Sequence, residues 1–226
     1  DIATVVKHCE RHGGPLDVHV ANLFHLLHPA GGLPRKRASY IEKERYLLSH
    51  GAHDSAKSRP CKLGHMKTNL ARSDAQRRAE LISNVHYLIE VDVTGREQFT
   101  SRTTVTFDSH AGETFFDLVA DEFTATLDGA PVEGRSLALS DGHHELIVDA
   151  TITYNRTGEG LHKFTDPVDG KDYLYTQFEP AMAMKVFAGF DQPDLKATYE
   201  IRVTAPERYT VVLNEATTRE GNTWST

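Results

Sequence analysis

An alternation of apolar and polar side chains over residues 85–93 constrains the fold of this chain more than any other feature. The apolar residues that share one parity are Val85, Tyr87, Ile89, Val91 and Val93. A histidine and two acidic residues lie between them, and the pattern continues through Phe99, Val105 and Phe107. Because successive side chains of a strand point to opposite faces, this period of two predicts strands with one buried face.

Turn signals separate the predicted strands. Asp-Gly pairs at 128–129 and 141–142, together with Thr94-Gly95, are typical of turns between neighbouring strands. Further strands are predicted over 173–177, 196–205 and 209–213. Eight or nine short strands with few helices indicate a mainly β fold, an antiparallel saddle-like β-sandwich with one or two short helices. Ser73 and Gln76 form a capping-box pattern that predicts one of these helices from about residue 74 to residue 81.

The composition changes near Met66. Residues 1–65 contain both cysteines, eight of the thirteen histidines and an excess of basic over acidic residues, whereas residues 66–226 are strongly acidic. We therefore expect an irregular or non-native leading segment over 1–65 and a β domain over 66–226. A genuine extra domain is the alternative. Within the leading segment only 23–27 and 41–48 have helix-like patterns.

Histidine pairs in the leading segment have spacings that metal ligands on a helix would have. The pairs are His8 with His12 and His25 with His28. No carboxylate accompanies them, and a histidine-rich composition produces such spacings by chance. We predict no metal site in this chain.

Charge and hydropathy exclude several classes of partner. The net charge of −7 and a pI of about 6.0 argue against nucleic acid, which requires a basic face. No apolar run approaches the roughly 18 residues that a membrane helix needs, so we expect no membrane partner. No secretory signal is visible, and we expect a cytoplasmic protein.

Glu179 is the carboxylate that the sequence places most suggestively. It follows the predicted strand 173–177 and precedes Pro180, and Gln177 shares its parity. Rigid scaffolds present functional groups at strand ends, and a carboxylate there can bind a cation such as a peptide α-amine, whose pKa is roughly 8. The alternative is a solvated carboxylate that interacts with the N-terminus of a following helix.

The segments around this site resemble a known family. Residues 176–181 (Thr-Gln-Phe-Glu-Pro-Ala), 187–196 (Phe-Ala-Gly-Phe-Asp-Gln-Pro-Asp-Leu-Lys) and 156–170 resemble the N-terminal domain of zinc aminopeptidases of the aminopeptidase N family, in its bacterial, actinobacterial-type branch. The resemblance covers about residues 66–226. It departs from the family at Met182 and Met184, where charged residues are frequent, and at Gly189, where cysteine is frequent.

The resemblance implies roles for two residues. Glu179 corresponds to the residue that binds the free amine of the substrate, and Gln177 to one that lines the pocket for the first side chain. The expected substrates are peptides with a free N-terminus, and the expected cofactor is zinc. The chain contains no H-E-x-x-H motif, so we expect no catalytic residue and no zinc ligand in it. His144-Glu145 begins like that motif, but Val148 stands where the second histidine is required and the segment reads as a strand.

The zinc-binding part is therefore expected beyond Thr226, with the β domain truncated at its C-terminal end and inactive alone. An alternative of another class is a non-catalytic β-sandwich binding or scaffold module. A third reading is a relative that opens a lipid epoxide, which the bacterial-type segment 156–170 disfavours. Retention of both Gln177 and Glu179 favours the aminopeptidase, because a scaffold needs neither.

Overall fold

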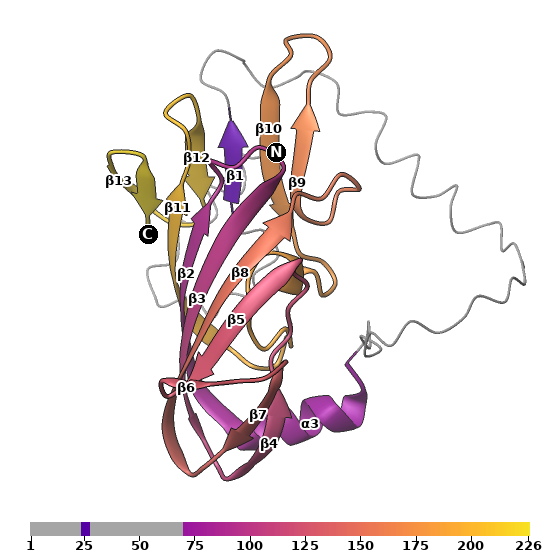
Figure 1. Cartoon of the computed structure of the whole chain (residues 1–226), viewed down its shortest axis with the longest axis vertical. Helices are drawn as coiled ribbons and strands as arrows, with labels where there is room; N and C mark the ends of the chain where they lie inside the picture. The colour runs from indigo at the N-terminus through magenta and orange to yellow at the C-terminus, as the bar shows by residue number, and fades with distance from the viewer. Residues whose placement is uncertain (1–23, 28–69) are drawn as a thin grey trace, which may run out of the picture.

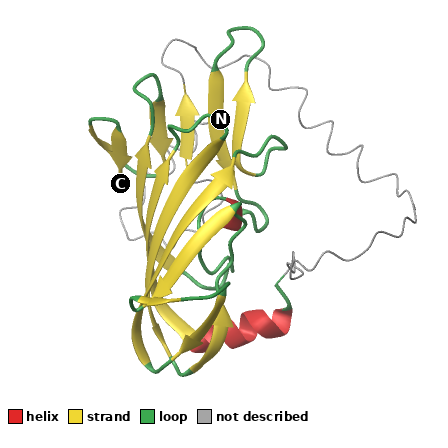
Figure 2. Cartoon of the chain, viewed as in Figure 1, coloured by secondary structure: helices red, strands yellow, loops and turns green. Residues whose placement is uncertain are grey.

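The computed structural model of the protein describes residues 24–27 and 70–226, and this part of the chain is mainly β (Figures 1 and 2). The largest sheet has eight strands, and the strands β2, β3 and β8 at its centre are long and twisted. Their order across the sheet is β13 (Thr218–Glu220), β14 (Thr223–Ser225), β11 (Ala197–Thr204), β2 (Ile82–Asp92), β3 (Gln98–Ser109), β8 (Gly142–Thr153), β5 (Glu122–Leu127) and β6 (Ala130–Pro131). The predicted β fold is confirmed.

The period-two segment forms β2, and its apolar parity is buried. Val85, Ile89 and Val91 are at most 5% exposed, whereas Glu90 and Asp92 on the opposite face are partly exposed. The Asp-Gly turn is also confirmed, since Asp128 and Gly129 join β5 to β6 with φ of 52° and 79°. Sequence alternation and turn chemistry thus predict the central strands and their faces.

The eight-stranded sheet is mixed, not wholly antiparallel as expected. β11 runs parallel to β2, with Ala197 opposite Val85 and Thr204 opposite Asp92. Turn residues identify hairpins between consecutive strands, and they contain no information about a pairing between segments more than a hundred residues apart.

A second sheet of four strands lies beside the upper part of the first (Figure 1). Its order is β12 (Thr210–Leu213), β1 (Phe24–Leu27), β10 (Asp172–Gln177) and β9 (Gly160–Thr165). The helix-like interpretation of 23–27 was wrong, because Phe24–Leu27 pairs as a strand with both β10 and β12. The segment 41–48 and the two histidine pairs, apart from His25, lie outside the described residues. The division of the chain at residue 65 stays a prediction.

The helix α3 (Arg72–Leu81) begins two residues earlier than predicted. Ala71 is its N-cap and no side chain caps it, so Ser73 lies inside the helix and the capping-box prediction was wrong. α3 leads directly into β2 and lies at the end of the domain where β4 (Gly112–Phe115) pairs with β7 (Ser136–Leu139) (Figure 1).

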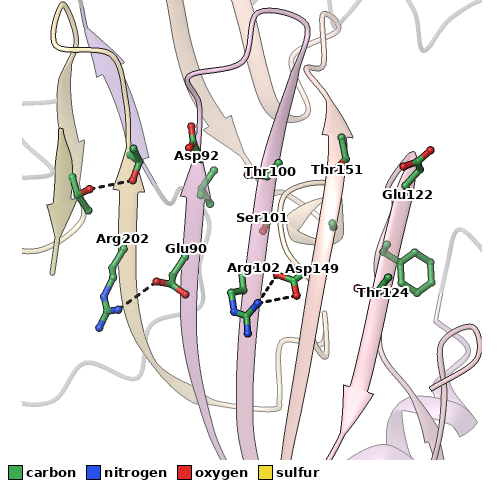
Figure 3. A pocket seen from close by; sticks show the side chains of 15 residues that line it. Glu90, Asp92, Thr100, Ser101, Arg102, Glu122, Thr124, Asp149, Thr151 and Arg202 are labelled. Carbon is green, nitrogen blue, oxygen red and sulfur yellow. Dashed lines mark hydrogen bonds and ion pairs between the residues drawn. The ribbon is translucent and has the colours of Figure 1, made fainter. Parts of the chain in front are cut away.

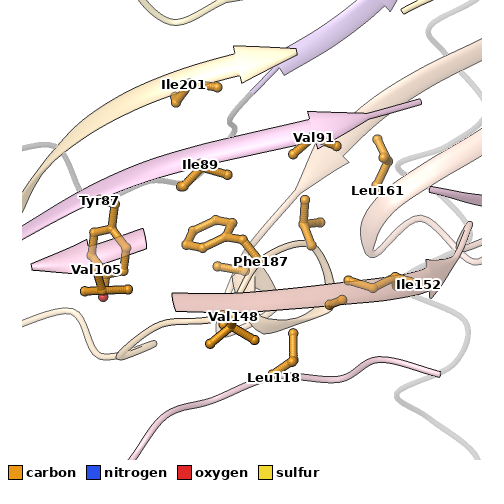
Figure 4. Close-up of a cluster of buried hydrophobic side chains, with 14 of the residues drawn as sticks. Tyr87, Ile89, Val91, Val105, Leu118, Val148, Ile152, Leu161, Phe187 and Ile201 are labelled. Atoms are coloured by element: carbon orange, nitrogen blue, oxygen red, sulfur yellow. The ribbon is translucent and has the colours of Figure 1, made fainter. Parts of the chain in front are cut away.

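The hydrophobic core lies against one face of the large sheet, and Figure 4 shows part of it. Side chains of β2, β3, β8 and β11 pack there against two segments without strand structure, around Leu118 and Phe187. The rings of Phe107 and Phe190 pack edge to face with their centroids 5.3 Å apart, and the rings of Tyr87 and Tyr199 stack with their centroids 5.0 Å apart. The buried side chains between residues 178 and 190, among them Phe178, Phe187 and Phe190, are therefore part of the core.

Candidate functional site

Gln177 and Glu179 lie together at the end of β10, as the sequence predicts. Gln177 is the last residue of the strand, is half-buried and stands opposite Gly160 of β9. Glu179 follows two residues later and is exposed. No hydrogen bond or ion pair joins its carboxylate to any other residue in the described part of the chain.

The backbone that carries Glu179 is held from both sides. Thr176 and Phe178 are 0% and 3% exposed, and after the turn Val186 and Phe187 are 0% and 5% exposed. The N–H of Met182 donates to the carbonyl of Phe178 at 2.8 Å, which closes the turn. In place of the predicted helix start after Pro180, the structure has this turn and the 3₁₀ turn η1 (Ala183–Lys185). The carboxylate thus projects from a fixed base.

The turn Asp191-Gln192-Pro193 joins this base to α3. Gln192 is 5% exposed, and its side-chain amide donates to the carbonyl of Ala75 at 2.9 Å. The Asp191 carboxylate accepts from the N–H of Met184 at 3.3 Å, and the Asp191 N–H donates to Asp117 at 3.0 Å. These contacts make the turn a structural element that fixes its neighbours.

A buried ion pair that sequence reasoning did not find supports the same region. The guanidinium of Arg78, a side chain only 1% exposed, lies 2.7 Å from a carboxylate oxygen of Asp117. It also stacks over the Phe115 ring at 4.3 Å from the centroid. Nε and Nη2 of Arg78 are buried without a hydrogen-bond partner in the described residues. Arg78 lies in the polar sequence Arg-Arg-Ala-Glu, which predicts a solvent-exposed helix face, so the sequence did not indicate that Arg78 points inward.

The loop between β8 and β9 meets the end of β10. Its residue Glu159 forms an ion pair with Lys185 of η1. Gly160 has a φ of +61°, and a Cβ added to it would lie 2.7 Å from Cβ of Lys185. The stem of Lys185 therefore covers the glycine that stands opposite Gln177.

His144 lies in the strand β8, as expected, and serves the structure. It is 4% exposed; its Nδ1 lies 2.7 Å from Asp128 and its Nε2 lies 3.0 Å from the carbonyl of Ser140. Although burial opposes protonation, the bonds to Asp128 and Ser140 raise the pKa of His144 above its usual value. Among residues 70–226 and 24–27, no group of three His, Cys, Asp or Glu side chains could hold a metal ion.

A hollow of about 810 Å³ on the outer face of the large sheet is the other candidate (Figure 3). Threonines and charged residues line it. Two ion pairs lie in it, since Arg102 lies 2.8 Å from Asp149 and Arg202 lies 3.3 Å from Glu90. Asp92 and Glu122 also line it, and neither forms an ion pair with another described residue. Neither Gln177 nor Glu179 lines this hollow.

The described residues thus form a β domain with a twisted sheet of eight strands and a second sheet of four. The chain belongs to the Peptidase M1 N-terminal domain family, whose match covers residues 100–225. No helix in the described residues is long and apolar enough to cross a membrane.

Curated relatives are aminopeptidases. The chain is 43% identical over 173 residues to aminopeptidase N of Streptomyces lividans, a match that covers 70% of this chain and 20% of that protein. It is 44% identical over 77 residues to a probable M1 family aminopeptidase 2 of Encephalitozoon cuniculi, covering 34% of this chain and 9% of that protein. The match thus spans about a fifth of the Streptomyces lividans relative.

Solved structures share the fold. Yeast LTA4 hydrolase in complex with bestatin has a TM-score of 0.54 and 16% identity, covering 70% of this chain and 30% of that one. Native yeast LTA4 hydrolase has a TM-score of 0.53 and 16% identity, covering 65% and 26%. At this identity the likeness establishes the fold alone.

Proposed function

We propose that this chain is the N-terminal part of a zinc-dependent aminopeptidase that removes N-terminal amino acids from peptides. In this proposal Glu179 binds the free amine of the substrate and Gln177 contacts its first side chain. Membership of the M1 family supports the peptidase class. The proposal extends to a cytoplasmic location and to peptides with a free N-terminus as substrates.

The observation that carries the proposal is the state of Glu179. Its carboxylate is exposed and bonds to no other described residue, although Phe178 before it and Val186 and Phe187 after the turn are buried and hold the backbone. A carboxylate without another partner is available to an ammonium group, and because the backbone is already held, binding restricts mainly the side chain. An internal peptide bond offers no ammonium group, so such a contact would restrict cleavage to the terminal residue.

Gln177 suits a side-chain contact because it is half-buried at the strand end. Its amide has both donor and acceptor groups, so it tolerates apolar and polar neighbours alike. Gln177 and Glu179 are two residues apart. In this proposal Glu179 binds the amine and Gln177 contacts the side chain of the same substrate residue.

Zinc does not fit the residues described here, since no three of them form a metal-ligand group. We assign the metal and the hydrolytic step to another part of the full-length protein. The 226-residue chain alone should therefore hydrolyse no amino-acid anilide, with or without added zinc. Hydrolysis above background would contradict this division.

The test is Glu179→Gln in the full-length protein. Loss of a charge-assisted contact, worth about 1.5–3 kcal/mol, should lower kcat/KM for a leucine anilide by roughly 10- to 100-fold, mainly through KM. Glu133→Gln is the matched control, because Glu133 is also an exposed glutamate without a bond to another described residue. Equal kinetics for both variants would remove Glu179 from the site and favour the non-catalytic β module.

A further inference from the structure

The Glu159–Lys185 ion pair lies at the proposed substrate site and has no role in the function argued so far. β9 and β10 are antiparallel neighbours (Figure 1), and Gln177 stands opposite Gly160 at the end of their ladder. In an antiparallel pair of strands, the residue before a paired residue on one strand lies on the same side as the residue after its partner on the other strand. Glu159 therefore lies one residue beyond the end of this ladder, on the side from which the chain leaves β10 toward Glu179.

The loop that carries Glu159 is ordered by its own hydrogen bonds. The side-chain oxygen of Asn155 accepts from the N–H groups of Thr157 and Glu159, at 2.6 and 3.4 Å. The N–H of Gly158 donates to Nδ1 of His162 at 3.0 Å. Burial, and then the charge of Arg156, lower the pKa of His162 below its usual value, which keeps the ring a neutral acceptor. These hydrogen bonds hold the backbone of the loop at Glu159.

Lys185 reaches Glu159 from the segment that also carries Glu179. Its Cβ lies against Gly160, and its Nζ pairs with Oε2 of Glu159. The side chains of Lys185 and Glu159 are 27% and 44% exposed, so the pair borders solvent. The nearby cation Arg156 turns instead to Glu97 at 3.3 Å.

The charges at this end of β10 follow from these contacts. Glu159 and Lys185 cancel, and Glu179 remains as a single negative charge without a partner in the described residues. A substrate with an uncharged first side chain brings a single ammonium group. A lysine or arginine as first residue brings a second cation, for which no uncompensated carboxylate remains.

We propose that the Glu159–Lys185 ion pair is a specificity determinant, in which Lys185 masks Glu159 and thereby disfavours peptides with a basic first residue. The inference rests on the proposed function and deepens it. It makes Lys185 a selectivity residue that acts through charge, and it gives the loop 155–160 a role in substrate choice.

The experiment uses the full-length protein with leucine and arginine anilides. Lys185→Met unmasks Glu159 and should raise the arginine-to-leucine ratio of kcat/KM about three- to fivefold, the size of a solvent-bordering ion pair, through a lower KM for arginine. Glu159→Gln leaves Lys185 uncompensated and should lower the ratio by a similar factor. The double variant restores neutrality and should return the ratio to the wild-type value.

The control is the Arg102–Asp149 pair, which is also a basic–acidic pair at the surface but is more exposed and lies on the outer face of the sheet. Arg102→Met and Asp149→Asn should leave the ratio unchanged. If Lys185→Met and Glu159→Gln change both substrates equally, or shift the ratio in the same direction, the pair only holds the loop and the inference is overturned.

Failure of the proposed function gives a different result. If Glu179→Gln has unaltered kinetics in the same assay, or if the wild-type protein cleaves neither anilide, the substrate site itself is refuted and this inference with it. If Glu179→Gln behaves as expected while the ratios stay fixed, only the selectivity role is refuted.

Discussion

The buried Arg78–Asp117 pair predicts an asymmetric response to mutation. Arg78 is 1% exposed, whereas the side chain of Asp117 is 19% exposed and accepts a second hydrogen bond, from the N–H of Asp191. Removing one partner of a buried pair leaves the other charge uncompensated, which costs about 3–5 kcal/mol when that charge is fully buried. The cost therefore depends on which partner remains.

Asp117→Asn leaves the arginine, whose Nε and Nη2 already have no partner in the described residues. We expect a loss of about 3–5 kcal/mol in the free energy of unfolding. Arg78→Met replaces the guanidinium that lies over Phe115 with an apolar side chain, and it leaves a partly solvated carboxylate with its remaining N–H donor. We expect a smaller loss, about 2–3 kcal/mol, close to that of a hydrogen bond to a charged group.

The assay is urea unfolding of the chain at pH 7, followed by tryptophan fluorescence and circular dichroism, with the double variant Arg78→Met/Asp117→Asn included. Since neither charge remains in the double variant, its loss should be at least 1.5 kcal/mol smaller than the sum of the single losses. Equal losses for the two single variants, or additive losses in the double variant, would refute the reasoning.

Two further predictions concern stability. His144 has a raised pKa in the folded state, so its contribution to stability is fully present below about pH 6.5 and is lost as the pH rises through the folded-state pKa. In urea unfolding, the free-energy advantage of wild type over His144→Gln should therefore shrink from pH 6 to pH 9. A difference that stays constant over this range would contradict the prediction. Gly160→Ala should lower the free energy of unfolding by about 2 kcal/mol, and by more than Gly170→Ala, because both glycines have positive φ but only Gly160 is in contact with Lys185. Equal effects on the melting temperature would refute the close contact.

The sequence predicted the central strands because their pattern is local. The alternation at 85–93 and the Asp-Gly turn at 128–129 depend on neighbours within a few residues, and both are confirmed. The capping box failed although it too is a local pattern. Ser73 has a capping residue's chemistry, but the backbone at Ala71 already has the extended conformation of an N-cap and the helix starts there.

Non-local features could not be read in the same way. The parallel pairing of β11 with β2 and the insertion of β1 between β10 and β12 depend on segments distant in sequence. Arg78 lies on a helix whose polar composition predicts a solvated face, and only the fold brings Asp117 to it. At the candidate site the sequence predicted that Gln177 ends a strand and that Glu179 follows it, and this placement is confirmed; their roles stay a prediction. The ion pair of Lys185 with Glu159 could not be predicted, because 26 residues separate the two in sequence.

The close contact of Gly189 with Tyr87 limits how this domain can change over evolutionary time. A Cβ at position 189 would lie 2.9 Å from Cε1 of Tyr87 and 3.0 Å from its hydroxyl oxygen, which accepts the N–H of Phe190 at 2.9 Å. A residue with a Cβ at position 189 therefore requires the Tyr87 ring to shift, which disturbs both this hydrogen bond and the stacking of Tyr87 on Tyr199. Substitutions at positions 87 and 189 are thus coupled.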